Sequence, residues 1–459
     1  MGYKILPILS FIFCSNIYSA NFYVANEGND SNAGTENSPW KSIQFAVDNG
    51  QVNAGDTITV KPGSYQPFHV TKSGNGSAQL VIKSASKYAA IIQGSERFDG
   101  RDAGIHLVTE YVTIDGFDVV CSGTPASNPG ERGIRLSGFP NDFKYGVIIR
   151  NNRVTGAGWV GITTSYAHDV IVEFNEVSNS VVQHGIYIAN SGDRPIIRNN
   201  IIHNNNQAGL HMNGDLPSGA SGEVDGTISN AIIENNIIYA NSGGAASSAI
   251  NLDGVNNSII RNNLLYNNFS QGISNFQIDG GLPSSNNRII NNTLVMPNDA
   301  FHALKFRNGS DSGFVRNNIL IQQGSGDALA VCDSCMQNLD SDYNIIVHLT
   351  NQNSTVENHG SLTDWQNNTG QDANSLTISA GNVGSTLSSN FTNPTNTASA
   401  DYSLVVNSIA IDTGITVSDA STDINGYNRP SGTSYDIGAY EFGGASVMPT
   451  PQNLQLDKN

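Results

Sequence analysis

A short motif recurs seven times between positions 147 and 320, and it constrains the fold more than any other feature of the chain. Each copy has an apolar pair, usually Ile or Val, then asparagine, then a second apolar pair, as in "PIIRNNII" (195–202). The last asparagines of the copies lie 23 to 36 residues apart, at Asn152, Asn175, Asn200, Asn236, Asn263, Asn292 and Asn318. Internal repeats of about 20 to 50 residues indicate a solenoid.

The apolar residues of the repeat indicate which solenoid this is. Leucine-rich repeats have a similar period, but they would place Leu at fixed positions where this chain has Ile and Val. We therefore predict an all-β fold, a right-handed parallel β-helix whose coils have about three short strands with stacked inward apolar side chains. Asparagine suits the bends, because it hydrogen-bonds nearby backbone, tolerates left-handed angles and can stack in a ladder between coils. Most asparagines are therefore predicted to be structural.

A second strand family accompanies the motif, with copies such as "GIRL" (133–136), "GIYI" (185–188) and "ALKF" (303–306). Side chains alternate along a strand, so the apolar residues Ile134, Ile186, Leu210, Ile250 and Leu304 are predicted to point inward. The residues that follow them, and their equivalents, form an outward column of Arg135, Thr163, Tyr187, His211, Asn251, Ser274 and Lys305. Two positions further along lies a second column, with Ala189, Asn213, Asp253 and Arg307.

The ends of the chain differ from the repeats. Residues 1–20 carry a short apolar run and end in small residues, which predicts a signal peptide and a secreted or periplasmic protein. We assign 21–345 to the β-helix, 346–444 to C-terminal β turns and a cap that includes 407–414 and 436–442, and 445–459 to a flexible tail. A short helix around Trp40–Val47 is expected to cap the open N-terminal coil.

Charge and cysteines limit the partners. The net charge of −17 argues against nucleic acid, and no later segment is apolar enough for a membrane helix. An acidic polymer stays possible where cations gather locally. Cys332 and Cys335 are interpreted as a small-loop disulfide, with free thiols as the alternative, and Cys121 as a lone buried cysteine. We expect a monomer.

The two outward columns carry the candidate chemistry, because they mix Tyr, His, Asn, Lys and Arg where a solvated strand face would carry Thr, Ser and Lys. β-Elimination from a uronate needs a cation that neutralises the carboxylate, a base for the adjacent proton and an acid for the leaving oxygen. Lys305 could be the base, with its pKa lowered by Arg307, and Arg307 could equally grip a carboxylate. His211 and Tyr187 form a second candidate acid/base pair.

Further polar residues complete the predicted site. Substrate-binding roles are assigned to Arg135, His184, Asn213 and Asn251, and Ca²⁺ is expected as a cofactor held by Asp215, Asp253 and Asp279. Purely structural interpretations remain open. Lys305 could be an edge-protecting lysine, and Asp215 could cap the Asn-Gly turn that precedes it.

The segment "FYVANEGNDSNAGTENSPWKSIQFAVD…AGDTITVKPGSY" (22–65) and the turns "IIRNN…GIYI" resemble right-handed parallel β-helix polysaccharide lyases. The similarity is to the alginate lyase/chondroitinase B group and to β-helix pectate lyases that use a lysine base, and it covers about residues 22–345. It implies a lysine, with or without arginine, on the outward sheet, and calcium. Lys305 and Arg307 match in kind and placement, whereas a cluster of neighbouring calcium aspartates is not evident.

Three functions follow as hypotheses. The first is an enzyme, a lyase that cleaves a uronate-containing acidic polysaccharide such as alginate by β-elimination, with an epimerase as a variant that returns the proton. The second is a glycoside hydrolase with Asp215 and Asp253 as acid and base, which inverting cleavage places about 6.5–9.5 Å apart. The third is a non-catalytic carbohydrate-binding surface protein.

Overall fold

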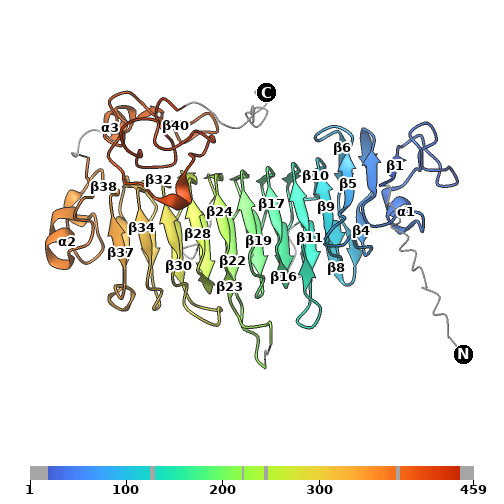
Figure 1. Cartoon of the computed structure of the whole chain (residues 1–459), viewed down its shortest axis with the longest axis horizontal. Helices are drawn as coiled ribbons and strands as arrows, with labels where there is room; N and C mark the ends of the chain where they lie inside the picture. The colour runs from blue at the N-terminus through green and yellow to red at the C-terminus, as the bar shows by residue number, and fades with distance from the viewer. Residues whose placement is uncertain (1–18, 125–129, 220–221, 242–246, 379–382, 445–459) are drawn as a thin grey trace, which may run out of the picture.

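Three long parallel sheets wrap around one apolar core, as a computed structural model of the chain shows (Figure 1). The structure describes residues 19–124, 130–219, 222–241, 247–378 and 383–444. Nearly all of the predicted signal peptide (1–20) and the predicted tail (445–459) therefore lie outside the described residues. No helix in these ranges is long and apolar enough to cross a membrane.

Each coil contributes one strand to each sheet, so strands that are neighbours in a sheet are one coil apart in sequence. The first sheet contains β1 (Asn21–Val24), β2 (Thr57–Val60), β5 (Leu80–Ser84), β9 (Val112–Asp115), β13 (Ile148–Arg150), β17 (Ile171–Glu173), β20 (Ile196–Arg198), β24 (Ile232–Glu234), β28 (Ile259–Arg261), β31 (Arg288–Ile290), β34 (Phe314–Arg316) and β37 (Asp340–Asp342). The second sheet contains β3 (Gly63–Tyr65), β6 (Ala90–Gln93), β10 (Asp118–Val120), β14 (Arg153–Thr155), β18 (Glu176–Ser178), β21 (Ile201–His203), β25 (Ile237–Tyr239), β29 (Leu264–Tyr266), β32 (Thr293–Met296), β35 (Ile319–Gln322) and β38 (Ile345–His348).

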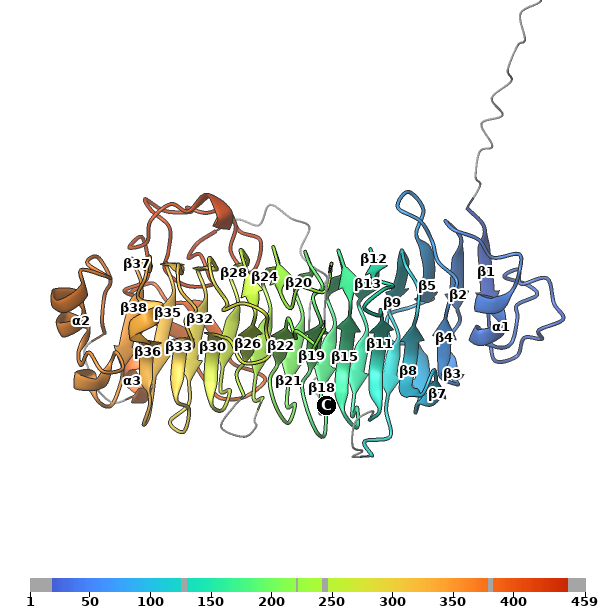
Figure 2. The same ribbon diagram turned by 90° about the horizontal axis from the view of Figure 1, so that it is seen from below.

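The third sheet carries the outward columns, and in Figure 2 its strands lie in a row across the molecule. It contains β4 (Phe68–Val70), β8 (Arg101–Leu107), β11 (Arg132–Ser137), β15 (Val160–Ser165), β19 (Ile186–Ala189), β22 (Leu210–Asn213), β26 (Ile250–Asp253), β30 (Gln271–Phe276), β33 (His302–Phe306) and β36 (Asp327–Val331), with β7 (Glu96–Phe98) antiparallel to β8. Short parallel pairs, β12 (Lys144–Tyr145) with β16 (Ala167–His168) and β23 (Ile228–Ser229) with β27 (Val255–Asn256), form in the turns that lead from the third sheet to the first. The predicted inward residues Ile134, Ile186, Leu210, Ile250 and Leu304 are all fully buried, which confirms the alternation.

Asparagines form the corner between the first and second sheets, where two neighbouring positions have different structural roles. The first residue of the pair adopts a left-handed conformation, as Asn199 does with φ 55°. The second points inward: the Asn200 side-chain amide donates to the Val172 carbonyl and to Asn236 Oδ1 in the next coil. This ladder is continuous from Asn152 to Asn344 and confirms the structural interpretation of the asparagines.

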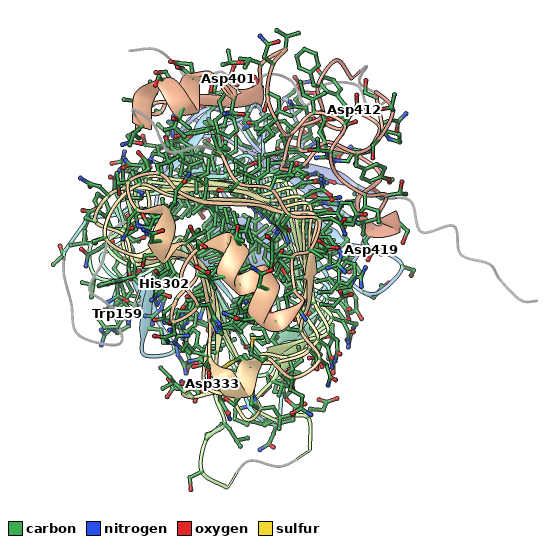
Figure 3. The ribbon with its side chains drawn as sticks, turned by 90° about the vertical axis from the view of Figure 1, so that its left-hand side faces the viewer. Trp159, His302, Asp333, Asp401, Asp412 and Asp419 are labelled. Carbon is green, nitrogen blue, oxygen red and sulfur yellow. A yellow bond between two sulfur atoms is a disulfide. The ribbon has the colours of Figure 1, made fainter. Side chains whose placement is uncertain are left out.

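The two ends of the β-helix are covered by helices. The helix α1 (Ile43–Asp48) packs against β4, and it begins at Ile43 because the Ser42 side chain caps the Phe45 N–H. At the other end, α2 (Leu362–Thr369) lies across the coils in Figure 3 and buries Trp365. The N-terminal capping helix is thus confirmed, and it begins slightly later than predicted.

The residues after α2 fold back along the side of the β-helix. They contain α3 (Val383–Ser388), the antiparallel pair β39 (Phe391–Asn393) and β40 (Asp401–Leu404), and short 3-10 turns such as Ser418–Ala420. Asn291 donates to the Asp436 carbonyl and Asn317 to the Ile415 carbonyl, so the segment lies on the corner between the first and second sheets. Residues 407–414 and 436–442, predicted to close the end, lie on this flank, and no described residue of 383–444 lies over the third sheet in Figure 2.

The cysteines are described as well. Cys332 and Cys335 form the predicted disulfide beside the 3-10 turn Asp333–Cys335. Cys121 is a free thiol and is half-buried rather than fully buried.

Candidate active site

The strand register confirms the first outward column. Arg135, Thr163, Tyr187, His211, Asn251, Ser274 and Lys305 are paired from strand to strand along the third sheet. Neighbouring strands lie about 4.8 Å apart, so the six steps from Arg135 to Lys305 span about 29 Å. The column is therefore long enough to line a polymer, but its two ends cannot act on one bond.

Three aromatic rings meet near the middle of this column. The rings of His184 and His211 are stacked with centroids 4.4 Å apart, and the Tyr187 ring lies 4.9 Å from that of His211. His184 is almost fully buried, and its Nδ1 accepts a hydrogen bond from the Ala208 N–H. His184 therefore packs behind Tyr187 and His211, which form the predicted acid/base pair, more than it faces a ligand.

Burial sets the protonation states of this pair. It lowers the pKa of His211 to about 4, so the imidazole is neutral at neutral pH. Burial also raises the pKa of Tyr187 to about 12, partly offset by a hydrogen bond with Asn213, so the phenol keeps its proton. A neutral imidazole next to a protonated phenol offers one proton acceptor and one proton donor.

A chain of hydrogen bonds runs from His211 along the third sheet. The Asn251 side-chain amide lies 2.7 Å from His211 Nδ1, and Ser248 Oγ lies 3.1 Å from Asn251 Oδ1. Ser248 Oγ lies 3.0 Å from Ser274 Oγ, which donates to Gln271 Oε1. His211 Nδ1 is thus occupied within the protein, and Nε2 is the ring nitrogen left for a substrate. Asn251, predicted to bind substrate, contacts His211 through its side-chain amide.

The three predicted calcium ligands surround the same region without forming a metal site. Asp215 and Asp279 are near enough that each raises the pKa of Tyr187 by charge repulsion. The Asp215 carboxylate accepts from the Asn190 amide, and Asn213 Nδ2 lies 3.4 Å from Asp279 Oδ2. No group of three or more His, Cys, Asp or Glu within the described ranges is arranged to hold a metal.

Asp253 has a structural task of its own. Its buried carboxylate accepts hydrogen bonds from the backbone N–H groups of Ile278, Asp279 and Gly280, at 2.8–3.1 Å. These bonds fix the loop after β30. A carboxylate whose oxygens are already taken by backbone donors is a poor calcium ligand or general acid, so the predicted calcium ligands do not fit a site in this arrangement.

Lys305 stands at the far end of the column. Burial and the charge of Arg307 lower its pKa to about 8, as the sequence predicts. No carboxylate of the described residues pairs with the Lys305 amine at ion-pair distance, whereas the Arg307 guanidinium is bound to Glu357. His302 lies 3.9 Å from the same Glu357. The charge of Arg307 is therefore already neutralised within the protein, whereas the sequence indicated Arg307 as a residue that could bind a substrate carboxylate.

The predicted catalytic residues thus fall into two groups. His211 and Lys305 are separated by three strand steps, which is about 14 Å. Tyr187 with His211 forms one centre, and Lys305 with Arg307 forms another. Only the first pairs a neutral acceptor with a protonated donor in direct contact.

A pocket of about 690 Å³ lies beside Tyr187, and it contains two arginines that the sequence pattern missed. Arg101 and Arg132 join the predicted Arg135 in its lining. Alternation assigns position 132 to the inward side with Ile134, so nothing marked Arg132 as outward. Arg101 follows the Asp99-Gly100 turn of the β7–β8 hairpin, and an Asp-Gly pair is a hairpin signal that could have located it.

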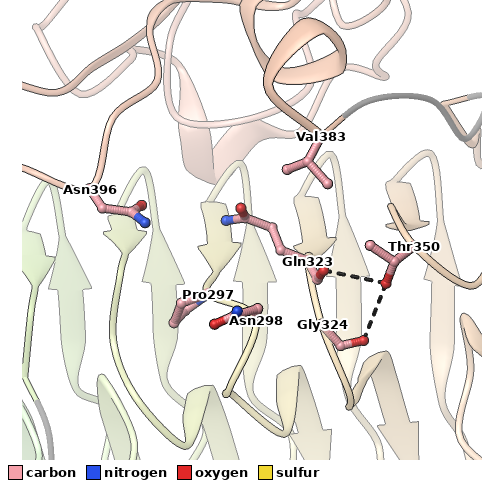
Figure 4. A pocket seen from close by; sticks show the side chains of 7 residues that line it. All are labelled: Pro297, Asn298, Gln323, Gly324, Thr350, Val383 and Asn396. Atoms are coloured by element: carbon pink, nitrogen blue, oxygen red, sulfur yellow. Dashed lines mark hydrogen bonds between the residues drawn. The ribbon is translucent and has the colours of Figure 1, made fainter.

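A second pocket lies between the β-helix and the C-terminal segment (Figure 4). Its volume is about 540 Å³, and residues such as Pro297, Gln323 and Thr350 line it. None of its described lining residues is an acidic, basic or histidine side chain.

Residues 22–171 match a family model described as "Pel9A-like, right handed beta helix region". Over 153 residues the chain is 31% identical to "Pectate lyase PEL9" of Emericella nidulans; that match covers 30% of this chain and 35% of the relative. The resemblance to β-helix polysaccharide lyases and the right-handed parallel β-helix are thereby confirmed. The family match includes Arg101, Arg132 and Arg135 and ends before Tyr187, His211 and Lys305.

A solved structure extends the likeness in fold to most of the chain. The crystal structure of pectate lyase Pel9A aligns over 93% of this chain and 97% of its own, with a TM-score of 0.57 and 16% identity. That identity shows a common fold alone. A glycoside hydrolase aligns over 66% of this chain and 88% of its own, with a TM-score of 0.48 and 11% identity.

Proposed function

We propose that the protein is an exported polysaccharide lyase that cleaves a uronate-containing polysaccharide by β-elimination at Tyr187 and His211. The observation that carries this proposal is the contact between a neutral, buried imidazole and a protonated phenol on the uncovered face of a pectate-lyase-like β-helix. The sequence relationship to a pectate lyase supports the reaction class.

The geometry supports one assignment of proton transfers. The structure places the Asn251 side-chain nitrogen at His211 Nδ1. We propose that the amide is turned by 180° in the reactive state, so that its oxygen accepts the Nδ1 proton and Nε2 carries the lone pair. Nε2 takes the C5 proton of the uronate, the C4–O bond breaks, and a C4=C5 double bond forms. Tyr187 donates its proton to the leaving oxygen. Return of the imidazolium proton to the phenolate, through solvent, restores both groups.

Lys305 receives a different role in this proposal. It lies about 14 Å from His211, and Arg307 beside it is bound to Glu357, so the cation that an elimination needs is missing there. We propose that the Lys305 amine binds a substrate carboxylate further along the groove. Glycoside hydrolysis by Asp215 and Asp253 is less well supported, because Asp253 holds three backbone N–H groups.

The first test is the ultraviolet absorbance of unsaturated uronate products. Alginate, polygalacturonate and glycosaminoglycans would be incubated with the protein, each with added Ca²⁺ and with a chelator. We expect a rise with at least one uronate polymer, and its loss in His211→Ala and Tyr187→Phe. New reducing ends without that absorbance would move the assignment to hydrolysis.

A matched pair of variants locates the base. Lys305→Ala should keep kcat within about an order of magnitude and mainly raise KM, whereas His211→Ala should lower kcat by about 100-fold or more. The reverse result, with elimination lost in Lys305→Ala and kept in His211→Ala, would move the reaction centre to Lys305.

A further inference from the structure

The pocket beside Tyr187 combines features that point to an anionic ligand. It is lined from β8, β11, β15 and β19 and from the Asp99-Gly100 turn. Three arginines, Arg101, Arg132 and Arg135, line it together with the carboxylates Asp99 and Asp215, in a chain whose net charge is −17. Such a cluster of cations is unexpected in an acidic protein unless something negative binds there.

Arg132 and Arg135 differ from the other arginines of the chain in their interaction partners. The other ten arginines and Arg101 each have a carboxylate within 4.0 Å, and Arg132 and Arg135 have none among the described residues. Arg132 donates to the Gly130 carbonyl, and Arg135 donates to Ser137 Oγ. Arg132 Nε and Arg135 Nη1 are buried and have no hydrogen-bond partner in the part of the chain that the structure describes, and Arg132 is only 8% exposed.

Keeping these cations buried and close together is costly. Burial lowers the pKa of Arg132 to about 10, and burial together with the charges of Arg132 and Arg101 lowers that of Arg135 to about 9. The neighbouring His106 is neutral, because burial and the charges of these arginines lower its pKa to about 3, so it adds no further positive charge. An anion that enters the pocket would satisfy the free N–H donors and reduce the repulsion.

We propose that Arg132 and Arg135, assisted by Arg101, bind the carboxylate of the uronate that reacts at Tyr187. The inference rests on the proposed function. Arg135 stands two strands from Tyr187 in the same column, about 10 Å at the backbone, and the phenol and the Arg132 charge interact electrostatically. A planar guanidinium matches a carboxylate in a two-bond grip and supplies the positive charge that acidifies the C5 proton.

The proposal is tested by calorimetric binding in a His211→Ala background, which keeps the ligand from being consumed. The probes are trigalacturonate and trimannuronate, with galactotriose and mannotriose as uncharged equivalents. Arg135→Gln and Arg132→Gln should each raise the Kd for an acidic trimer by about tenfold or more. Arg97→Gln is the matched control, because Arg97 lies on the neighbouring hairpin strand but is exposed and paired with Asp102; its Kd should stay within about twofold.

Two results would overturn the proposal: acidic trimers that bind equally well to the background and to both arginine variants, or uncharged trimers that bind as tightly as acidic ones. Folding is checked by thermal denaturation. Each variant removes a repelling charge, so its Tm should not fall. If a variant fails to fold, sodium chloride titration of the background replaces it, since affinity that depends on ion pairing must weaken with salt.

The outcomes also separate this inference from the proposed function. Arginine-dependent binding without unsaturated product from any polymer would retain the subsite and reject elimination. Unsaturated product whose formation and KM are unchanged in Arg132→Gln and Arg135→Gln would retain elimination and reject the subsite.

Discussion

Tyr187 and His211 acquire their chemistry from burial. Neither residue forms an ion pair with any described residue, and both pKa shifts arise chiefly from loss of solvent. The sequence located both side chains, because alternation along a strand and the repeat period fix which residues share a face. It could not show that Arg307 is bound to Glu357, 50 residues later, since that contact depends on a turn beyond the last coil.

Tyr187→Phe should lower kcat by about 100- to 10,000-fold with little change in KM, because the phenyl ring keeps the packing and loses the proton donor. Steady-state kinetics on the polymer identified by the absorbance test would measure both constants. Tyr166→Phe is the matched control, since Tyr166 lines the same pocket outside the Tyr187–His211 contact. Equal losses in the two variants would contradict the assigned role of Tyr187.

The pH dependence of kcat/KM distinguishes the two candidate bases. His211 has a pKa lowered to about 4, so it loses its function as a base only when pH falls toward 4. Tyr187, with a pKa raised to about 12, stays protonated across the neutral range. We therefore expect a plateau through neutral pH. A rate that instead rises through pH 8 would identify Lys305, whose pKa is about 8, as the base.

At the scale of the repeating element, the asparagine pair explains why the fold was predictable. One asparagine turns the backbone and the next bonds two neighbouring coils, so the motif specifies both a bend and a register. The irregular loops are different. The sequence did not reveal that Asp253 anchors the loop after β30, because its partners are backbone N–H groups whose position depends on tertiary structure.

Asn236→Ala should lower the free energy of unfolding by about 3 kcal/mol. The change removes the buried acceptor of the Asn200 backbone N–H, one of the two hydrogen bonds of the Asn200 side-chain amide, and the side-chain donor to the Ile197 carbonyl. Urea denaturation followed by circular dichroism would measure the loss. Asn206→Ala is the control, because Asn206 is exposed and donates a single bond to Val182, so it should cost less than about 0.5 kcal/mol. Equal costs would refute a special role for the ladder.

At the scale of the whole molecule, the C-terminal segment shows the limit of sequence periodicity. Residues 407–442 have no repeat, and their place on the flank is set by contacts such as the Arg288–Asp419 ion pair. In Figure 3, His302 on the third sheet lies apart from Asp412 and Asp419 of this segment. The segment thus lies away from the third sheet at this end of the β-helix.

Buried histidines should make the protein sensitive to acid. His106, with a pKa lowered to about 3, stays neutral in the folded state, while the unfolded chain binds a proton below about pH 6.5. Stability is thus lost as pH falls through this window, by up to about 1.4 kcal/mol per pH unit for this group.

The variant His106→Gln measures the contribution of His106 to this pH dependence of stability. Its unfolding free energy, measured in urea at pH 7, 6 and 5, should depend less steeply on pH than that of the wild type. Subtracting the slope of the variant from that of the wild type removes the contributions of other titrating groups. One of these is Asp436, whose pKa is raised to about 6 and whose effect on stability is opposite in sign. Identical slopes would show that His106 is not neutral in the folded protein.

The asparagine ladder has a consequence for how such a protein can diversify. Neighbouring coils are joined by the same asparagine hydrogen bond throughout the ladder. A whole coil can therefore be duplicated or deleted in the gene, and the same hydrogen bonds form at the new junctions. Each event would lengthen or shorten the row of exposed side chains by one strand spacing, about 4.8 Å. Related proteins would then differ in the length of polymer that they contact while they keep the same fold.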